Sequence, residues 1–111
     1  MILREWRGVT PTSKRDEYLA YMEKTGIKAH TGLKGNHGVM VMTRDLPNNR
    51  SEVVILTLWE SREAIEAFTG GRADKARYYT KEQDFLVEMP TDVIHYDIRQ
   101  TDGLPGGSSR P

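Results

Sequence analysis

The sequence predicts an α+β fold whose strands and helices follow the order β-α-β-β-α-β. Four segments have the alternating or continuous apolar pattern that is typical of strands. Two others have apolar residues at helical spacing. The most informative stretch is residues 53–59, which is apolar on both faces and leads through Ser61 directly into the second helical segment. A strand of this kind must be covered on both sides, and a short chain has few elements with which to cover it.

The composition excludes several classes of function. The chain has 111 residues, which suits a single domain, and its 16 basic residues balance 16 acidic ones. This balance leaves no basic excess for nucleic acid or an anionic membrane. There is no cysteine, so disulfides, zinc–cysteine sites and thiol nucleophiles are excluded. Charges follow closely after the first three residues, and no apolar run approaches a membrane span, so we expect a cytoplasmic protein without a signal peptide.

The first strand is expected over residues 2–9 and the first helix over 13–25. Ser13 and Asp16 resemble a capping box at the start of this helix. Gly26 follows its end, at the position where helices favour glycine. Its buried stripe has helical spacing and comprises Tyr18, Leu19, Tyr21, Met22 and Thr25.

The middle of the chain predicts a β-hairpin. Residues 27–36 carry glycines and polar side chains and are expected to form a loop. The second strand is predicted over 38–44 and the third over 52–59, antiparallel to the second. Residues 45–50 contain Pro and two Asn and form the connection between them.

Ser61 is expected to cap the second long helix, which ends at Gly70 and Gly71. Another helical turn or two is predicted over residues 74–79. Residues 81–89 are expected to be irregular, and residues 92–99 alternate as a fourth strand. The inward positions of the second helix are Ala64, Ile65 and Phe68.

The end of the chain differs in composition from the rest. Residues 102–111 are rich in Gly, Pro and Ser, and Leu104 is the one sizeable hydrophobic side chain among them. We therefore expect a folded domain over residues 1–100 and a flexible tail over 101–111. Removing residues 102–111 is expected to leave the fold and the expected dimer intact, with thermal stability lowered by no more than a few degrees.

This element order is the ferredoxin-like arrangement, an antiparallel sheet with both helices on one face. The other face is left uncovered. An apolar sheet face of several hundred Å² is not left in water, so we expect two such sheets to pack face to face in a homodimer, a dimeric α+β barrel. The residues 54, 56 and 58 are expected to face the helices. The side chains expected on the uncovered face are Val53, Ile55, Thr57 and Trp59.

Trp59 ends the third strand, where an indole either walls a ligand pocket or fills the dimer core. Thr57 shares its face and joins the predicted binding residues. Trp6 and Arg4 share one face of the first strand, and Trp6 belongs to the same predicted pocket. A buried Arg4 would require an anion, and the alternative is an ion pair at the edge of the interface.

The histidines and two tyrosines supply further candidates. His95 alternates with apolar neighbours, so it is either a pocket residue that transfers protons or binds a ligand, or a structural histidine. His37 opens the second strand and could reach the same pocket, whereas His30 lies in a polar loop and carries little weight. Tyr78 and Tyr79 either close the pocket, with a phenolic hydrogen-bond donor, or pack beneath the following segment.

Several of these stretches together resemble the antibiotic biosynthesis monooxygenase domain family. The resemblance covers about residues 1–99 and rests on Arg4-x-Trp6-Arg7-Gly8 and on the runs at 56–65, 76–79, 84–86 and 93–96. It implies a dimeric α+β barrel. The family contains oxygenases that act without a cofactor on aromatic polyketides, and oxygenases that degrade haem. The haem-degrading branch requires an asparagine, a tryptophan and a histidine; Trp59 matches the tryptophan, but Tyr78 stands at the histidine position, and Trp6 or Arg7 at that of the asparagine.

Three functions follow as hypotheses. The first is a monooxygenase without metal or cofactor, acting on a small aromatic or polyketide-like substrate in a pocket between the helices and the sheet, with His95, Arg4 and Tyr78 as catalytic groups. The second is a haem- or small-ligand-binding protein, and the third an isomerase or cyclase. No phosphate-binding loop and no metal-ligand spacing occurs in the sequence. The residues predicted to bind the substrate are Trp59, Trp6, Tyr79, His37 and Thr57.

Overall fold

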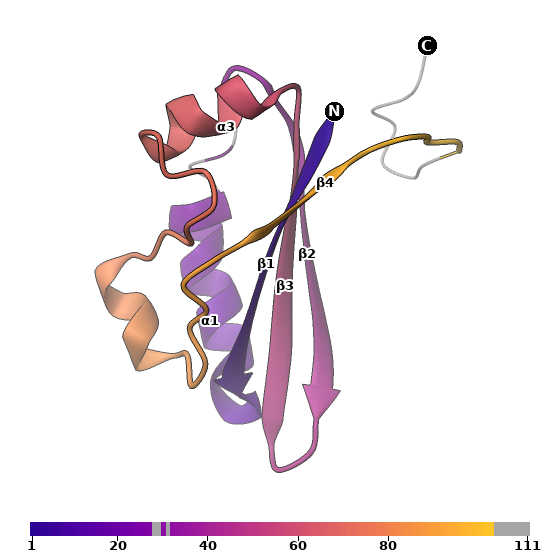
Figure 1. Cartoon of the computed structure of the whole chain (residues 1–111). Coiled ribbons are helices and arrows are strands. Elements are labelled where there is room, and N and C mark those ends of the chain that lie inside the picture. Colours follow the sequence, from indigo (N-terminus) through magenta and orange to yellow (C-terminus); the bar gives the residue numbers. More distant parts are fainter. Residues whose placement is uncertain (28–29, 31, 104–111) are drawn as a thin grey trace.

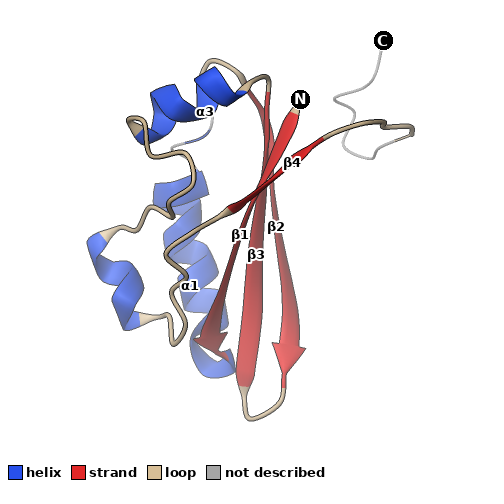
Figure 2. Cartoon of the chain, viewed as in Figure 1, coloured by secondary structure: helices blue, strands red, loops and turns tan. Residues whose placement is uncertain are grey.

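The structure is a computed structural model that describes residues 1–27, 30 and 32–103. The chain forms one sheet with helices on one side (Figures 1 and 2). The strands pair antiparallel in the order β2-β3-β1-β4, which confirms the ferredoxin-like α+β prediction. The strands and helices are β1 (Ile2–Pro11), α1 (Arg15–Met22), β2 (Asn36–Leu46), β3 (Arg50–Trp59), α3 (Arg62–Thr69) and β4 (Ile94–Asp97).

The β2–β3 hairpin forms where the sequence predicts it. Asn48 and Asn49 both have positive φ, 66° and 58°, a conformation that Asn adopts more readily than most residues and that a tight hairpin turn requires. The two strands pair from Leu46–Arg50 up to Asn36–Trp59. One irregularity interrupts this pairing, between Asn36 and Gly38.

The first helix differs from the prediction at both ends. No side chain caps α1, and a 3-10 turn at Thr12–Lys14 precedes it, so the predicted capping box of Ser13 and Asp16 does not form. A π turn at Glu23–Ile27 continues the helix, and Gly26 lies within this turn instead of ending α1. The second helix follows the prediction: the Ser61 hydroxyl accepts a hydrogen bond from Ala64 N at 3.2 Å, and Gly70 ends α3 with φ 68°.

The predicted helical turns over residues 74–79 are wrong. This segment runs beside the chain ahead of β4 because Ala76 N donates to Thr91 O and Val93 N to Asp74 O. The helical turn falls later, as the 3-10 turn at Thr80–Asp84. The same bonds leave β4 only four residues long, shorter than the predicted 92–99. Residues 104–111 of the predicted tail lie outside the described residues.

The assignment of the two faces of β3 is also wrong. Val53, Thr57 and Trp59 are almost completely buried beneath the helices and not on the uncovered face. Their neighbours in register are Gly8, Arg4 and Ile2 of β1, so the face that carries Arg4 is the helix-covered face. Because β3 is apolar on both faces, its alternation alone could not decide between them.

The uncovered face, here called the open face, is nevertheless apolar as expected. Register pairs Leu56 with Met40 of β2, and Leu3 of β1 with Tyr96 of β4. Met40, Ile94 and Tyr96 are each 51% exposed. The apolar side chains of the open face are Leu3, Met40, Met42, Val54, Leu56, Leu58, Ile94 and Tyr96.

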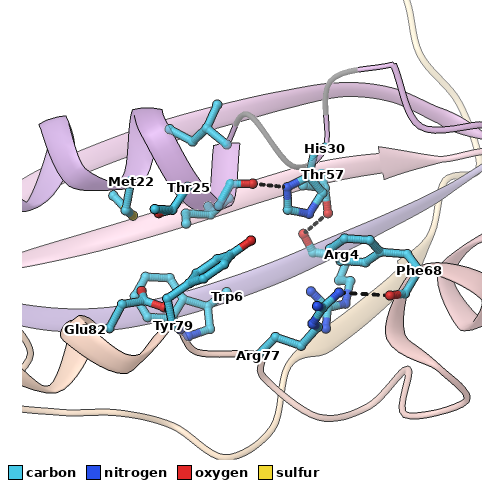
Figure 3. Close-up of a pocket in the computed structure, with 13 residues that line it drawn as sticks. Arg4, Trp6, Met22, Thr25, His30, Thr57, Phe68, Arg77, Tyr79 and Glu82 are labelled. Atoms are coloured by element: carbon cyan, nitrogen blue, oxygen red, sulfur yellow. Dashed lines mark hydrogen bonds between the residues drawn. The ribbon is translucent and has the colours of Figure 1, made fainter.

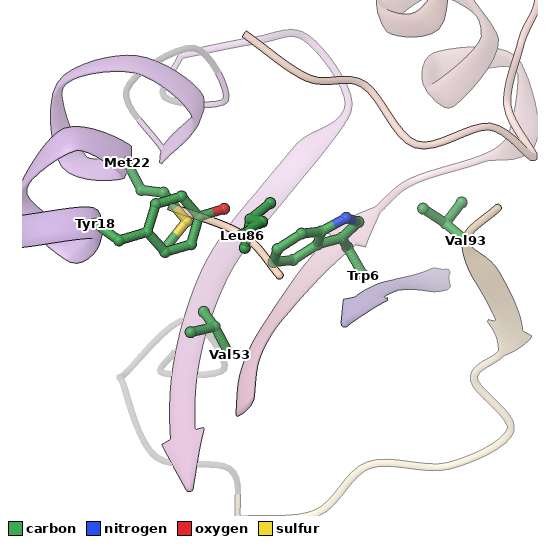
Figure 4. Close-up of a cluster of buried hydrophobic side chains, with 6 residues drawn as sticks. All are labelled: Trp6, Tyr18, Met22, Val53, Leu86 and Val93. Atoms are coloured by element: carbon green, nitrogen blue, oxygen red, sulfur yellow. The ribbon is translucent and has the colours of Figure 1, made fainter. Parts of the chain in front are cut away.

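The core lies between the sheet and the helices in two clusters. The larger contains Tyr18 and Met22 of α1 packed toward Val53, with Trp6 and Leu86 beside them (Figure 4). The smaller surrounds Trp59 at the other end of β3, where Ile65 and Ala73 cover it. Residues from both clusters line a cavity, among them Trp6 of the larger and Phe68 of the smaller. In the described part of the chain, no helix is long and apolar enough to cross a membrane.

Candidate functional site

The cavity lies on the helix-covered side of the sheet (Figure 3). β1 and β3 line it on one side, and residues from the end of α1, from α3 and from the segment 77–82 line it on the other. Its volume is about 70 Å³. This is about half the volume of an apolar protein cavity of roughly 150 Å³ that admits benzene. The lining residues are Arg4, Trp6, Met22, Thr25, Gly26, Ile27, His30, Ile55, Thr57, Phe68, Arg77, Tyr79 and Glu82.

Trp6 forms a fixed apolar wall. Its indole N–H donates to the Tyr78 hydroxyl at 3.0 Å, and this hydroxyl donates to Pro90 O at 2.5 Å. Burial raises the pKa of Tyr78, so the phenol stays neutral and able to donate. The indole also lies over Gly8, where an added Cβ would stand 2.5 Å from a ring carbon. Gly8 and Tyr78 thus hold the indole in one orientation.

His30 is the best-placed base in the cavity. Its Nδ1 lies 2.6 Å from Gly26 O; because a carbonyl only accepts, Nδ1 carries the proton and donates. Burial lowers the pKa of His30, and the charges of Arg4 and Arg77 lower it further against the opposing bond to Gly26. The imidazole is therefore neutral, with a lone pair on Nε2. This atom is buried and has no hydrogen-bond partner among the described residues.

Two arginines line the same cavity. Arg4 is buried, and its Nη2 donates to Lys75 O at 2.8 Å. Burial lowers the pKa of Arg4 to about 10, and the nearby charge of Arg77 lowers it as well. Arg77 donates to Phe68 O at 2.9 Å and stacks 4.6 Å from the centre of that ring. The Arg4 guanidinium therefore remains charged at neutral pH.

Glu82 is a buried carboxylate whose oxygens are already in use. Oε1 accepts from the Tyr18 hydroxyl at 2.7 Å, and Oε2 accepts from the backbone N–H of Tyr79, also at 2.7 Å. Burial, and then the charge of Glu82, raises the pKa of Tyr18, so this phenol remains a donor. Glu82 thus ties α1 to the segment that carries Tyr79. The Tyr79 side chain is 39% exposed and stands at the rim of the cavity.

The residues predicted as a site separate into three groups. Arg4, Trp6, Thr57 and Tyr79 line the cavity. Trp59 and Tyr78 lie behind its walls, where Tyr78 holds Trp6 and Trp59 packs on Phe68 and His30. The remaining two, His37 and His95, are absent from the lining; His37 is exposed at the start of β2.

His95 faces a different environment from the one expected. It pairs in register with Arg4, but its Nδ1 lies 3.4 Å from the exposed Asp74 carboxylate, and Asp74 also binds Arg62 at 2.9 Å. Burial lowers the pKa of His95, and the charges of Arg62 and Arg4 add to this against the opposing effect of Asp74. His95 thus belongs to a charged cluster at the β1–β4 side of the sheet.

Several residues that line the cavity were not predicted from the sequence. His30 was given little weight because it lies in a polar segment, but its imidazole contacts Gly26 O and packs against Phe68, with ring centres 4.6 Å apart. Phe68 was expected to face inward, and its helical spacing was the available signal. Arg77 and Glu82 carried no such signal, since Arg77 lies outside the helices and strands and Glu82 lies in a short 3-10 turn.

Replacing Trp59 with phenylalanine is expected to destabilise the fold by about 1–3 kcal/mol. The Trp59 indole N–H donates to the Thr57 hydroxyl at 2.9 Å, and this change leaves that buried hydroxyl without its donor. Ligand binding should weaken less, because Trp59 supports the cavity from behind Phe68. Urea unfolding of both proteins measures the first effect. Unchanged stability with lost ligand binding would show that Trp59 contacts the ligand directly.

Folding stability is expected to fall as the pH drops below about 6.5, the ordinary histidine value. His30 and His95 both have lowered pKa values in the folded protein, so the unfolded chain binds their protons more tightly. Their contribution is therefore complete above that pH and is lost as the pH falls through the folded-state values. Urea midpoints measured from about pH 7.5 to 5 check this, and His95→Asn should reduce the slope. A flat profile would contradict the burial of the two rings.

Within the described residues, no group of three or more His, Cys, Asp or Glu side chains could hold a metal ion. The cavity instead combines an unpaired neutral imidazole, two guanidinium groups and aromatic walls. Such a set can accept a proton from a small molecule and stabilise the resulting anion out of contact with bulk water.

Comparison with known proteins supports the fold. No protein-family model and no curated protein matches the chain. A candidate antibiotic biosynthesis monooxygenase from Bacillus cereus has a similar structure, with TM-score 0.63, 14% identity, and coverage of 93% of this chain and 97% of that one. The haem-degrading protein MhuD from Mycobacterium tuberculosis, solved with two haems in its active site, gives TM-score 0.62, 17% identity and coverage of 93% and 100%. At these identities the chain shares the fold of both proteins, as the resemblance implied.

Proposed function

We propose that the protein is a cofactor-independent monooxygenase of a small aromatic substrate with an acidic phenolic or enolic proton. The observation that carries this proposal is His30, a neutral base with an unpaired Nε2 at an apolar cavity. The shared fold with a candidate antibiotic biosynthesis monooxygenase adds support. The base assigned from the sequence, His95, is replaced in this proposal by His30, because His95 does not line the cavity.

The proposed reaction converts an activated CH2 group and O2 into a carbonyl group and water. His30 takes the substrate proton, and the carbanion or phenolate that forms passes electrons to O2 to give a peroxide. Loss of water from the peroxide leaves one oxygen atom in the product as the new carbonyl. The aromatic walls of Trp6 and Phe68 exclude bulk water, which would otherwise protonate the anion.

The size of the cavity restricts the substrate. At about 70 Å³ it accepts one aromatic ring only if a side chain at the rim moves, and the half-exposed Tyr79 is the one placed to do so. Haem is disfavoured, because ligand pockets for large molecules measure about 300–1,000 Å³. His30 Nε2 has the chemistry of an iron ligand, so the small volume of the cavity is what weighs against haem.

Oxygen consumption with a panel of one-ring hydroquinones tests the proposal. We expect O2 uptake with one or more of them, and a product that carries one atom of label from 18O2. Conversion of the same compounds without O2 would instead assign an isomerase or cyclase that uses the same base. A Soret shift at stoichiometric haemin would favour the haem-binding alternative, which the small cavity disfavours.

We also propose that the chain acts as a homodimer through the open face. The apolar side chains of this face are interrupted by Glu5, which lies between Leu56 and Ile94 in register. Glu5 belongs to a network of four charged residues on the sheet: Arg7–Glu52 at 2.9 Å, Arg44–Glu52 at 3.2 Å and Arg7–Glu5 at 3.4 Å. The two acids and two bases cancel, so a second copy would meet little net repulsion. Homodimer interfaces of this kind bury on the order of 2,000 Å².

A further inference from the structure

Two positively charged groups meet at the cavity without a carboxylate partner. Arg4 and Arg77 both line it, and the charge of Arg77 is among the causes that lower the pKa of Arg4 (Figure 3). Neither forms an ion pair in the described part of the chain. Asp74 is near enough to favour the charge of Arg4, but it is exposed and already bound to Arg62. Like charges at a partly dehydrated site destabilise one another unless an anion lies between them.

Arg4 has the greater need for an anionic partner, because its charge is buried. It is more than nine-tenths buried, and its Nε has no hydrogen-bond partner among the residues described. Among the described residues, the one hydrogen bond from its side chain goes from Nη2 to the uncharged carbonyl of Lys75. A buried charged donor with no partner is costly, and proteins usually satisfy such a group. A ligand oxygen in the cavity would satisfy it.

Arg77 is held in place although its side chain is exposed. Its guanidinium stacks on the Phe68 ring and donates to the carbonyl of the same residue. These two contacts occupy one face of the guanidinium and one of its N–H groups. Its other N–H groups have no hydrogen-bond partner among the described residues. Phe68 also forms part of the cavity wall, so the stacking places the charge of Arg77 at the entrance.

We propose that Arg4 and Arg77 form an oxyanion-binding subsite whose ligand is a planar aromatic monoanion, a phenolate or a carboxylate. This rests on the proposed function and names its substrate class. A planar oxyanion matches the geometry of guanidinium donors, and aromatic walls match the ring. A dianion is disfavoured because the Glu82 carboxylate lines the same cavity. In the reaction, a proton taken by His30 would leave the negative charge where Arg4 can stabilise it.

The test measures binding of 4-nitrophenol, a one-ring probe whose phenolate absorbs visible light and whose neutral form does not. The subsite should bind the phenolate at least about tenfold more tightly than the uncharged 4-nitroanisole, and should lower the apparent pKa of the bound phenol by about one unit. Benzoate should displace the phenolate if the subsite also accepts a carboxylate. The lining also contains the ionisable side chains of His30, Tyr79 and Glu82. The concentration of the probe is therefore also varied at one fixed pH, so that a change of pH does not affect the comparison.

Arg77→Gln is the decisive variant because its side chain is exposed and its loss should not unfold the protein. It should weaken phenolate binding about tenfold and leave 4-nitroanisole binding unchanged. Arg72→Gln, an equal loss of charge five residues earlier and outside the cavity lining, is the matched control. Arg4→Gln should have the larger effect, and Arg4→Lys shows whether charge alone restores binding if the glutamine variant does not fold.

Equal binding of the phenol and the ether, an unchanged or raised pKa of the bound phenol, or equal effects of Arg72→Gln and Arg77→Gln would each overturn the subsite. Failure of the wild-type protein to bind the probe would do the same. None of these measurements requires turnover. Phenolate binding without O2 uptake on any substrate would therefore refute the proposed oxygenase and leave the subsite standing. O2 uptake with an unchanged KM in Arg77→Gln would refute the subsite and leave the oxygenase standing.

Discussion

Replacing His30 with glutamine is expected to lower kcat for oxygen-dependent turnover by about 100-fold or more. Glutamine is similar in size and its amide can still donate to Gly26 O, so the fold of the segment should persist. What it lacks is the basic lone pair that the imidazole presents at Nε2. KM should change little, because the ring walls and the arginines remain. The assay uses the substrate on which the wild-type protein consumes O2.

His37→Gln is the matched control for this experiment. It removes another histidine of the same chain from an exposed position that does not line the cavity, so kcat should remain within about twofold of wild type. Equal losses in both variants would contradict the assignment of the base to His30. So would a His30→Gln protein with wild-type kcat and lower stability, since that result describes a structural histidine.

The pH profile provides an independent check on the same residue. Burial lowers the pKa of His30, so the rate should stay constant down to a pH below the ordinary histidine value of 6.5 before it declines. The neutral form is the active one, and the decline therefore accompanies protonation as the pH falls. The acidic limb should disappear from the residual activity of His30→Gln.

The order of the elements was predictable because the hairpin turn and the start of α3 depend on local chemistry. Asn48 and Asn49 tolerate the positive φ of the hairpin turn, and Ser61 caps α3 with its own hydroxyl. The helical turns predicted at residues 74–79 failed for a non-local reason. Hydrogen bonds from Ala76 and Val93 join that segment to the chain before β4, and sequence alternation does not report such pairing.

The site was predictable in part. The sequence did not show which face of β3 the helices cover. Arg4 and Trp6 were correctly placed together, because one strand puts alternate residues on one face. Which face the helices cover depends on the total of apolar contacts on each side, and β3 is apolar on both. His30 could not be assigned to the site because the hydrogen bond from its Nδ1 to Gly26 O, in the π turn, becomes visible only in the folded structure.

Replacing Met40 with glutamate on the open face is expected to convert the proposed dimer to a monomer at micromolar concentration. Met40 is half exposed in the single chain and lies beside Leu56 in register, so the monomer should accept the charge without unfolding. In a face-to-face dimer the same carboxylate would be buried without a partner, and two-fold symmetry would place two of them in the interface. A total cost of about 4 kcal/mol raises the dissociation constant about 1,000-fold.

Sedimentation equilibrium measures the masses of the wild type, Met40→Glu and Ala67→Glu. Ala67 is an exposed position on α3, on the opposite side of the sheet, so its variant adds the same charge and should remain dimeric. The comparison separates burial of the open face from a general effect of net charge. A wild-type monomer would contradict the proposed dimer outright. A Met40→Glu protein that stays dimeric would place the interface elsewhere, and the apolar open face would then require a different partner.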